Sequence, residues 1–524
     1  MHTTSKTPAD AGPHRSGSTA RTRGAGRRVV AATASAGLVA LLGLLTACAP
    51  AERTPSALQS ETFPGVYAQT IAWGSCDESF GPNAETAERL DGLGSPVDTF
   101  ECATVEAPLD WDRPRVHETI DLAVVRIPAT GPEKLGSLFG NPGGPGGSGI
   151  DYTWNQTASP GFRGLLEHYD VIGFDPRGIG RSSAVDCEPI SSIFEVQLAV
   201  CADEEPLARS MGTSQVARDM DLLRALQGEE EMNYLGYSYG TILGATYATL
   251  FPERVGRMVL DSAPDETWAA PAGTFDQAVS MANELVAMLE DCEETEGVTA
   301  CPITSEDQLL AAEEALDAEP LVGSDGTEVS GAMLRGYLMT GLYGRAVTRV
   351  TVLNHVAGLF ERDPEEIDAV IQAMAEGGAS VSAGGQIVRC HSLPQDPGIL
   401  QLLEHVEEQG VPRLLGGPEI TDDVLRPFAD LSCDALPESG TDLDAFTAPD
   451  DQTILVIGIE GDHATPFENG KNLARQMGNT RFLTVEGHGH GASFTDRSSC
   501  ADEATTAFLL EGELPEPGTV CPAN

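Results

Sequence analysis

Short apolar runs alternate with amphipathic segments over the first half of the chain. Between about residues 99 and 261, runs such as MNYLGY and RVGRMVLDSA are almost continuously apolar, which is typical of strands buried on both faces. The segments SQVARDMDLLRALQG and TILGATYATLF have apolar residues at helical spacing. Two earlier runs, TFECATVEAPL and ETIDLAVVRIPA, predict an antiparallel pair of strands. Because strands and helices then alternate, we expect a mostly parallel sheet covered by helices on both faces.

The pattern changes over residues 265–445. Long amphipathic helices such as TFDQAVSMANELVAMLEDC and RAVTRVTVLNHVAGLFER follow one another there, and no strand stands out. Alternation of strands and helices returns at 446–524, with the runs TILVIGIEGD and TRFLTVEGHGH. We therefore predict one α/β domain, with a first part at 71–264, a second part at 446–524 and a helical cap inserted between them.

The N-terminus has the pattern of an export signal. Basic residues dominate positions 1–28, and the apolar run VVAATASAGLVALLGLL and then TAC follow them. The string LTAC resembles the bacterial lipobox, so residues 1–47 are predicted to be a signal peptide and Cys48 a lipidated cysteine on the outer face of the cell membrane. A secreted form and an uncleaved anchor are the alternatives, although 17 residues rich in Ala and Gly span a bilayer poorly. Residues 48–70 are predicted to be a tether.

The charge of the chain argues against two classes of partner. With 31 basic and 80 acidic residues, its formal net charge is −49. Such a surface repels nucleic-acid phosphates and anionic lipid headgroups, so neither is an expected partner. The acidic surface itself is more simply explained by solubility than by a substrate.

Ten cysteines follow Cys48, and an even number in an exported protein suggests disulfides. Pairing neighbours along the chain predicts bridges 76–102, 187–201, 292–301, 390–433 and 500–521. The cysteines are Cys76, Cys102, Cys187, Cys201, Cys292, Cys301, Cys390, Cys433, Cys500 and Cys521. No C-x-x-C motif and no histidine pair at zinc-ligand spacing is present, so no metal site is expected.

The string GYSYG places Ser238 between Gly236 and Gly240, directly after a predicted strand and before a predicted helix. This strand–turn–helix setting is the one that the G-x-S-x-G nucleophile motif requires, because the sharp turn exposes the hydroxyl. An ordinary strand–helix turn is the alternative. The context favours Ser238 as a nucleophile.

A serine nucleophile needs a base, and the last two predicted strands supply candidates. Asp462 follows the first of them in IEGDHATP, and His488 and His490 follow the second in TVEGHGHG. The order Ser238, Asp462, His490 is the chain order of α/β-hydrolase triads. In such a triad the aspartate orients the imidazole and stabilises its charged form.

The Gly-rich loop FGNPGGPGGSG, residues 139–149, predicts an oxyanion hole. Its backbone N–H at Gly144, together with that of Tyr239, would stabilise a developing oxyanion. The same loop matches G-x-G-x-x-G, so a dinucleotide site is the alternative. We reject that alternative because Pro145 lies inside the turn and no ribose-binding acid is clearly placed.

These residues carry a family resemblance. The motifs NPGGPGGSG, DPRGIGRSS, GYSYGT, LDSAPD, GDHATP and GHGHG resemble, in order, those of the tripeptidyl aminopeptidase branch of the proline iminopeptidase family. The likeness covers about Trp73–Cys521. It implies an exported serine exopeptidase with the α/β-hydrolase fold, in which Ser238, Asp462 and His490 form the triad. In the family the last histidine of the GHG ending is the catalytic one, which favours His490 over His488.

The chain departs from the family at two positions. Pro142 stands where proline iminopeptidases have the histidine of HGGPG, as is usual in the tripeptidyl branch, and this leaves the specificity open. His463 follows the aspartate where the family often has proline, which we expect to change little.

An aminopeptidase must also neutralise a free α-ammonium. Asp265 and Glu266 follow the strand that ends in MVLDSA, and we predict that one of them contacts the substrate amine, although two solvated acids are an equal alternative. The favoured function is thus a serine aminopeptidase that acts on peptides without a cofactor. A carboxylesterase with the same triad and a non-catalytic surface-binding protein are the alternatives.

Overall fold

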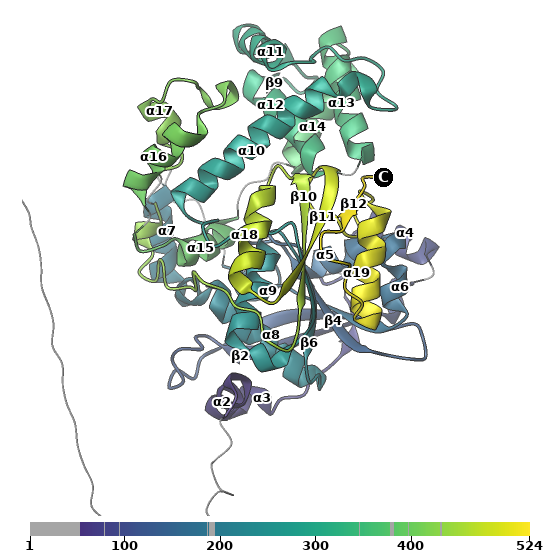
Figure 1. Ribbon diagram of the computed structural model, residues 1–524, viewed down its shortest axis with the longest axis vertical. Helices are drawn as coiled ribbons and strands as arrows, with labels where there is room; N and C mark the ends of the chain where they lie inside the picture. The colour runs from purple at the N-terminus through teal and green to yellow at the C-terminus, as the bar shows by residue number, and fades with distance from the viewer. Residues whose placement is uncertain are drawn as a thin grey trace, which may run out of the picture. The chain divides into compact units, whose positions relative to one another are not determined.

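The computed structural model describes residues 53–524, apart from 78, 94, 186, 188–193, 345, 378–381, 397 and 430–431. The predicted signal peptide and Cys48 therefore lie outside the described residues. Residues Thr54–Asn524 form one compact unit (Figure 1).

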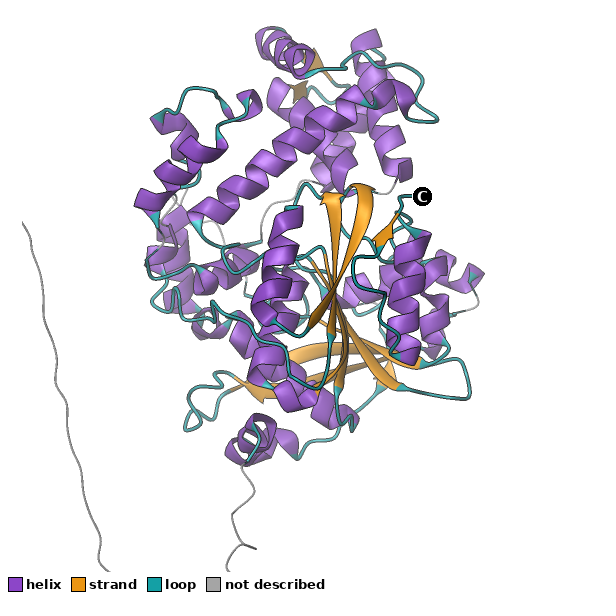
Figure 2. Ribbon diagram, in the orientation of Figure 1, coloured by secondary structure: helices purple, strands orange, loops and turns teal. Residues whose placement is uncertain are grey.

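A ten-stranded sheet lies at the centre of this unit (Figure 2). The strands are, in sheet order, β1 (Gly74–Ser75), β2 (Glu101–Pro108), β3 (Thr119–Ile127), β5 (Tyr169–Phe174), β4 (Gly136–Asn141), β6 (Met232–Tyr237), β7 (Val255–Asp261), β10 (Ile454–Gly461), β11 (Thr480–His488) and β12 (Val520–Cys521). The strands from β5 to β12 are parallel, and β1, β2 and β3 join them antiparallel. The predicted antiparallel pair β2–β3 and the mostly parallel sheet are both confirmed.

Helices cover both faces of the sheet (Figure 1). One face packs against α8 (Thr213–Gln227), α9 (Tyr239–Leu250) and α18 (Phe467–Met477), and the other against α5 (Gly149–Thr157), α6 (Arg163–Leu166) and α19 (Ser499–Glu511). Strand β7 contributes side chains to the hydrophobic cores on both faces of the sheet. Met258 and Leu260 belong to the first core, and Val259 between them belongs to the second. Because successive side chains point to opposite faces, a strand buried on both sides has no polar alternation.

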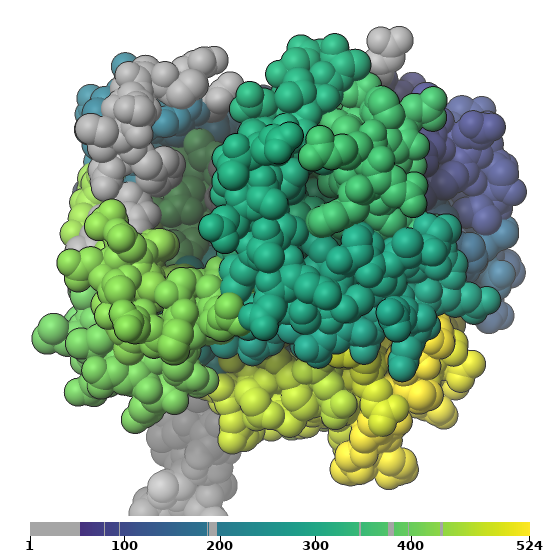
Figure 3. Space-filling model, turned by 90° about the horizontal axis from the view of Figure 1, so that it is seen from above, coloured from purple at the N-terminus to yellow at the C-terminus, as the bar shows by residue number. Residues whose placement is uncertain are grey.

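A helical insert separates β7 from β10, as the sequence predicted. Its helices are α10 (Pro271–Glu290), α11 (Glu306–Ala318), α12 (Gly331–Tyr343), α13 (Ala346–Glu361), α14 (Pro364–Gly377), α15 (Ala383–Ser392), α16 (Ile399–Gln409) and α17 (Asp422–Leu425). Viewed from above, atoms of the insert occupy most of that face of the molecule (Figure 3). Helices α10 to α14 share a core of their own.

Two features of the insert differ from the sequence prediction. It contains a short hairpin of β8 (Leu321–Val322) and β9 (Glu328–Val329). Each strand has only two residues, which is too short for a periodic pattern to predict. Helix α15 contributes Ile387 and Val388 to the core on the sheet, not to the core of the other cap helices. The boundary of the cap at 445 therefore remains a proposed division of the chain.

The predicted tether of residues 48–70 is wrong over most of its described length. Helices α2 (Pro55–Thr62) and α3 (Pro64–Tyr67) fold onto the hydrolase core. The Thr54 side chain accepts a hydrogen bond from Ala57 N to cap α2, and the Phe63 ring meets Trp111 edge-on at 4.8 Å. Proline at the first helical position favours a helix start, so the Pro-rich composition predicted the wrong structure. The other helices before the insert are α4 (Ala84–Gly92) and α7 (Phe194–Glu204).

All five disulfides predicted by pairing sequence neighbours are confirmed. They join 76 to 102, 187 to 201, 292 to 301, 390 to 433 and 500 to 521. Several disulfides are typical of proteins that fold outside the cytosol. None of the helices in the described part of the chain combines the length and the apolar composition needed to cross a membrane.

Candidate active site

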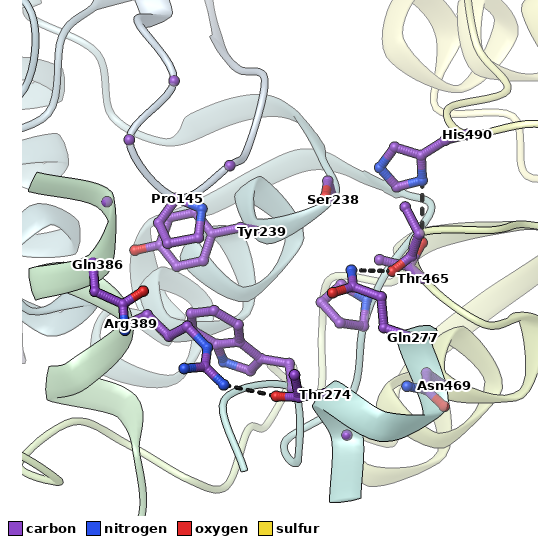
Figure 4. Close-up of a pocket in the computed structure, with 18 of the residues that line it drawn as sticks. Pro145, Ser238, Tyr239, Thr274, Gln277, Gln386, Arg389, Thr465, Asn469 and His490 are labelled. Carbon is purple, nitrogen blue, oxygen red and sulfur yellow. Dashed lines mark hydrogen bonds between the residues drawn. The ribbon is translucent and has the colours of Figure 1, made fainter. Parts of the chain in front are cut away.

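The carboxyl ends of neighbouring parallel strands bring the predicted site residues together. Ser238 follows β6, Asp462 follows β10, and His490 lies two residues after β11. Ser238 and His490 line one cavity of about 760 Å³ at this edge of the sheet (Figure 4). In this class of fold, functional groups gather at the carboxyl ends of the strands.

The turn that carries Ser238 has a strained backbone. Ser238 has φ 55° and ψ −130°, and its N–H donates to the Asp261 carbonyl oxygen at 3.0 Å. A Cβ at Gly236 would lie 2.5 Å from the Gly240 oxygen, and one at Gly240 would lie 2.8 Å from the Asn141 oxygen. Both glycines of G-x-S-x-G are therefore needed for close backbone approach, and the turn has the form of a nucleophile elbow.

Asp462 and His490 form a close pair. The Nδ1 atom of His490 lies 2.9 and 3.0 Å from the two carboxylate oxygens of Asp462, whose side chain is 1% exposed. The backbone N–H groups of Ala464 and Thr465 donate to Oδ1 at 2.9 Å, and the Thr465 hydroxyl lies 3.0 Å from Oδ2. Burial would raise the pKa of Asp462, but the charge of His490 and the hydrogen bonds of His490 and Thr465 hold that pKa below its ordinary value. The carboxylate thus stays ionised and directs Nε2 of His490 away from itself.

Asp261 is a positioning residue that the sequence analysis missed. Its buried carboxylate accepts hydrogen bonds from Ala492 N at 3.0 Å and Ser493 N at 2.7 Å, and the hydroxyl of Ser262 accepts one from Gly491 N at 2.9 Å. These bonds fix the loop directly after His490. An acid as the last residue of an apolar strand, in MVLD, was the signal that could have identified it.

The other two candidate histidines take different positions. His488 is exposed and contacts Glu284 of α10 at 2.5 Å, a contact that raises its pKa, so it lies outside the Asp462 pair. His463 is fully buried beside the Tyr343 ring, at 4.4 Å between ring centroids, and neither of its ring nitrogens bonds to another described residue. Burial lowers its pKa to about 3, so its imidazole is neutral.

The Gly-rich loop lies against the elbow, as an oxyanion hole requires. Gly144 and Tyr239 both line the cavity, and neither backbone N–H donates to another described residue. Asn141 Oδ1 accepts from Gly143 N at 2.9 Å and holds the loop. Gly143, which the sequence analysis did not single out, has φ 93°, and a Cβ there would lie 2.8 Å from the Ser238 Cβ.

The two acids predicted to bind a substrate amine do not line the cavity. Asp265 is buried, and its carboxylate accepts from Thr267 N at 3.0 Å and from Asn472 Nδ2 at 2.9 Å. Glu266 also lies outside the cavity wall. Both residues were predicted near the cleft because they follow a strand. Their place along the chain does not determine where their side chains point.

Cap helices complete the cavity wall. Thr274 and Gln277 of α10, Tyr343 of α12, and Gln386 and Arg389 of α15 line it. Helix α10 is tied to the Asp462 loop, because Gln277 Nε2 donates to the Ala464 oxygen at 2.5 Å (Figure 4). Among the described residues, no cluster of three or more His, Cys, Asp or Glu could hold a metal ion.

Comparison with known proteins agrees with this architecture. Residues 425–521 match a family described as TAP-like protein, and residues 138–288 match one described as alpha/beta hydrolase fold. Carboxylesterase B of Mycobacterium tuberculosis is 31% identical over 524 residues, covering 92% of this chain and 96% of the relative. Tripeptidyl aminopeptidase of Streptomyces lividans is 30% identical over 472 residues, covering 80% and 83%. Serine protease Hip1 of Mycobacterium tuberculosis is 28% identical over 464 residues, covering 80% and 87%. The chain belongs to the TAP-like family of α/β hydrolases.

Proposed function

We propose that this chain is an exported serine aminopeptidase, which releases short pieces from free peptide N-termini through an acyl-enzyme on Ser238. The observation that carries the proposal is the meeting of the Ser238 elbow and the Asp462–His490 pair at one cavity. Ser238 and His490 both line that cavity, and the buried Asp462 carboxylate lies behind the imidazole.

Each group has one role in the proposed reaction. Nε2 of His490 takes the Ser238 proton while Oγ attacks the substrate carbonyl, and Asp462 stabilises the resulting imidazolium. The electron pair of the C=O bond moves to oxygen, where the N–H groups of Gly144 and Tyr239 donate to it. The tetrahedral intermediate collapses and expels the amine, which takes the proton from His490. Water, deprotonated by His490, then releases the acid and restores the Ser238 hydroxyl.

The size and the lining of the cavity favour a short substrate. Its wall combines the Gly-rich loop of the core with side chains from α10, α12 and α15 of the insert. A space of about 760 Å³ is in the range of small-ligand pockets and holds a short peptide better than an extended chain. A tripeptidyl aminopeptidase is also among the relatives.

A carboxylesterase is the second candidate, and one observation favours it. No carboxylate belongs to the described residues that line the cavity, so this described part of the wall offers no anionic partner for a free α-ammonium. The same triad cleaves esters, and a relative 31% identical is named carboxylesterase B.

A comparison of substrates tests the proposal. The mature protein is incubated with tripeptide aminocoumarin amides that have free or acetylated N-termini, and with p-nitrophenyl butyrate. An aminopeptidase turns over the free-amine peptide at least about tenfold better than the acetylated one, because it acts only on an unblocked N-terminus, and a tenfold difference corresponds to ~1.4 kcal/mol. Ester hydrolysis without peptide hydrolysis would establish the carboxylesterase instead. Ser238→Ala should abolish all three reactions.

We also propose that residues 1–47 are a lipoprotein signal peptide and that Cys48 carries the lipid. The five disulfides support export. Because α2 begins at Pro55, only residues 49–54 would separate the lipid from folded protein. Intact-mass measurement of membrane-extracted protein should show a chain that begins at a diacylated Cys48, and an unmodified Cys48 rules the lipid out.

A further inference from the structure

Three aromatic rings meet edge-on where the loop that carries His490 faces the cap. The Tyr343 ring, at the end of α12, lies 4.4 Å from the His463 ring and 6.1 Å from the His490 ring between centroids, with interplanar angles of 89° and 82°. His463 is fully buried and neither of its ring nitrogens bonds to another described residue, so it supports Tyr343 as an apolar ring would. Tyr343 itself is 51% exposed and lines the same cavity as His490.

The Arg497 guanidinium joins this part of the cap to the catalytic loop. Its Nε donates to the Gly491 oxygen at 3.2 Å. Its Nη2 donates to the Tyr343 oxygen at 3.2 Å and to the Gly344 oxygen at 2.8 Å. A Cβ at Gly489 would lie 2.4 Å from the guanidinium carbon, so the group packs against the backbone on both sides of the catalytic histidine. These bonds fix the end of α12 beside that histidine, and a ring that is fixed before binding loses little freedom when a ligand arrives.

The contact with His490 assigns Tyr343 to one half of the substrate. In the proposed reaction His490 gives its proton to the leaving group, so the leaving group lies on the His490 side of Ser238. Figure 4 shows His490 on one side of Ser238 and Pro145 of the Gly-rich loop on the other. Tyr343 therefore lies on the leaving-group side, where its half-exposed ring can pack against an apolar group. Aromatic pairs gain more from such packing than their buried area alone provides.

We propose that Tyr343 forms a wall of the leaving-group subsite, so that this enzyme prefers an aromatic or large apolar side chain on the residue directly after the scissile bond. The inference rests on the proposed acyl-enzyme chemistry at Ser238 and names the substrate class of that same site. An ester would show the same preference in its alcohol, because the alcohol leaves on the same side.

Transfer of the acyl group to an added amine tests this subsite separately from the acyl side. The amine nitrogen bonds to the acyl carbon, its proton passes to Nε2 of His490 and then to Oγ of Ser238, and the bond from Oγ to the acyl carbon breaks. The amine thus retraces the path of a leaving group. The acyl donor is p-nitrophenyl butyrate, or the free-amine aminocoumarin tripeptide if only that substrate is hydrolysed. The acceptors are phenylalanine amide and alanine amide, at equal concentrations of unprotonated amine.

The measured quantity is the ratio of the two transfer products, phenylalanine amide over alanine amide, after subtraction of the reaction without enzyme. It is determined for the wild type, Tyr343→Ala, Tyr343→Phe and Phe360→Ala. Phe360 of α13 is a matched control, since it is an aromatic residue that is 46% exposed and lies outside the cavity wall. Thermal unfolding of each variant checks that it is folded.

The wild-type ratio should be at least about ten, and Tyr343→Ala should bring it close to one. Tyr343→Phe keeps the ring and should retain a ratio above about five, while Phe360→Ala should match the wild type. A wild-type ratio near or below one overturns the inference even if Tyr343→Ala fails to fold. An unchanged ratio in folded Tyr343→Ala also overturns it, and so does the absence of both transfer products while the donor is hydrolysed. If neither donor is hydrolysed and a fluorophosphonate does not label Ser238, the proposed function itself fails, and the inference with it.

Discussion

Replacing Asp462 by asparagine tests how the acid controls the tautomer of His490. The backbone N–H groups of Ala464 and Thr465 both donate to Oδ1 of Asp462, so an asparagine would place its carbonyl oxygen there. Its NH₂ group would then occupy the position of Oδ2, facing Nδ1 of His490 at about the present 3.0 Å. Because NH₂ is a donor, it opposes an N–H at Nδ1 and favours the tautomer in which Nδ1 accepts and the ring proton is on Nε2, while the retained oxygen, 2.9 Å from Nδ1, already accepts from two backbone N–H groups. An Nε2 that carries the proton cannot take one from Ser238.

The size of the effect follows from this geometry. The exchange changes few atoms, so substrate binding and the fold should persist while the base is lost. We expect kcat/KM to fall by about 10³–10⁴, or ~4–5 kcal/mol of transition-state stabilisation, with KM changing little. The assay is p-nitrophenyl ester hydrolysis together with the rate of fluorophosphonate labelling, which should fall in parallel.

The chain offers a matched control for this variant. Asp276 of α10 contacts His405 at 2.6 Å, and neither residue lines the cavity. Asp276→Asn therefore disturbs an Asp–His pair without touching the reaction, and its kcat/KM should stay within about twofold of wild type. The reasoning is refuted if Asp462→Asn keeps more than a tenth of the wild-type kcat/KM, or if both variants lose activity equally.

Three further predictions follow from the described contacts. A Cβ in Gly143→Ala would meet the Tyr237 oxygen at 2.5 Å, so labelling and hydrolysis should both fall at least about 100-fold; wild-type rates would contradict the placement of the oxyanion loop. His463 has a folded-state pKa of about 3 against an ordinary 6.5, so the unfolded chain binds the extra proton between these values and stability falls as pH drops through that window. The free energy of unfolding, measured by denaturant titration at pH 7 and at pH 4.5, should therefore fall by about 2–3 kcal/mol less in His463→Leu than in the wild type. An equal fall in both proteins would show that His463 is charged when folded. The Cys390–Cys433 disulfide closes 43 residues, so replacing both cysteines by serine should cost about 4 kcal/mol and lower Tm, whereas an unchanged Tm would deny the bridge a stabilising role.

The sequence predicted the parts of this molecule that depend on chain order and periodicity. Continuous apolar runs identified the parallel strands, because side chains that face both layers must all be apolar. Residues that follow neighbouring parallel strands must meet at one edge, and this rule brought the Ser238 and His490 loops to one cavity. Pairing adjacent cysteines worked because each pair is joined by a short stretch of chain.

The sequence failed where tertiary contacts decide the outcome. Asp265 was expected in the cleft, but local bonds to Thr267 and to Asn472, 207 residues away, turn its carboxylate into the protein. Arg389 lies in a helix about 150 residues from Ser238, and no periodicity links it to the cavity that both line. The composition of the predicted tether pointed away from two helices, which pack on the core through contacts such as that of Phe63 with Trp111.

The central claim is that Ser238 is a nucleophile activated by His490. The most direct test is mass spectrometry of the mature protein after incubation with a fluorophosphonate, in the wild type and in His490→Ala. The account predicts one adduct per chain, on the peptide that contains Ser238, and a labelling rate that is at least about 1,000-fold lower in His490→Ala. Labelling of another residue, or of Ser238 at the same rate without His490, would contradict it.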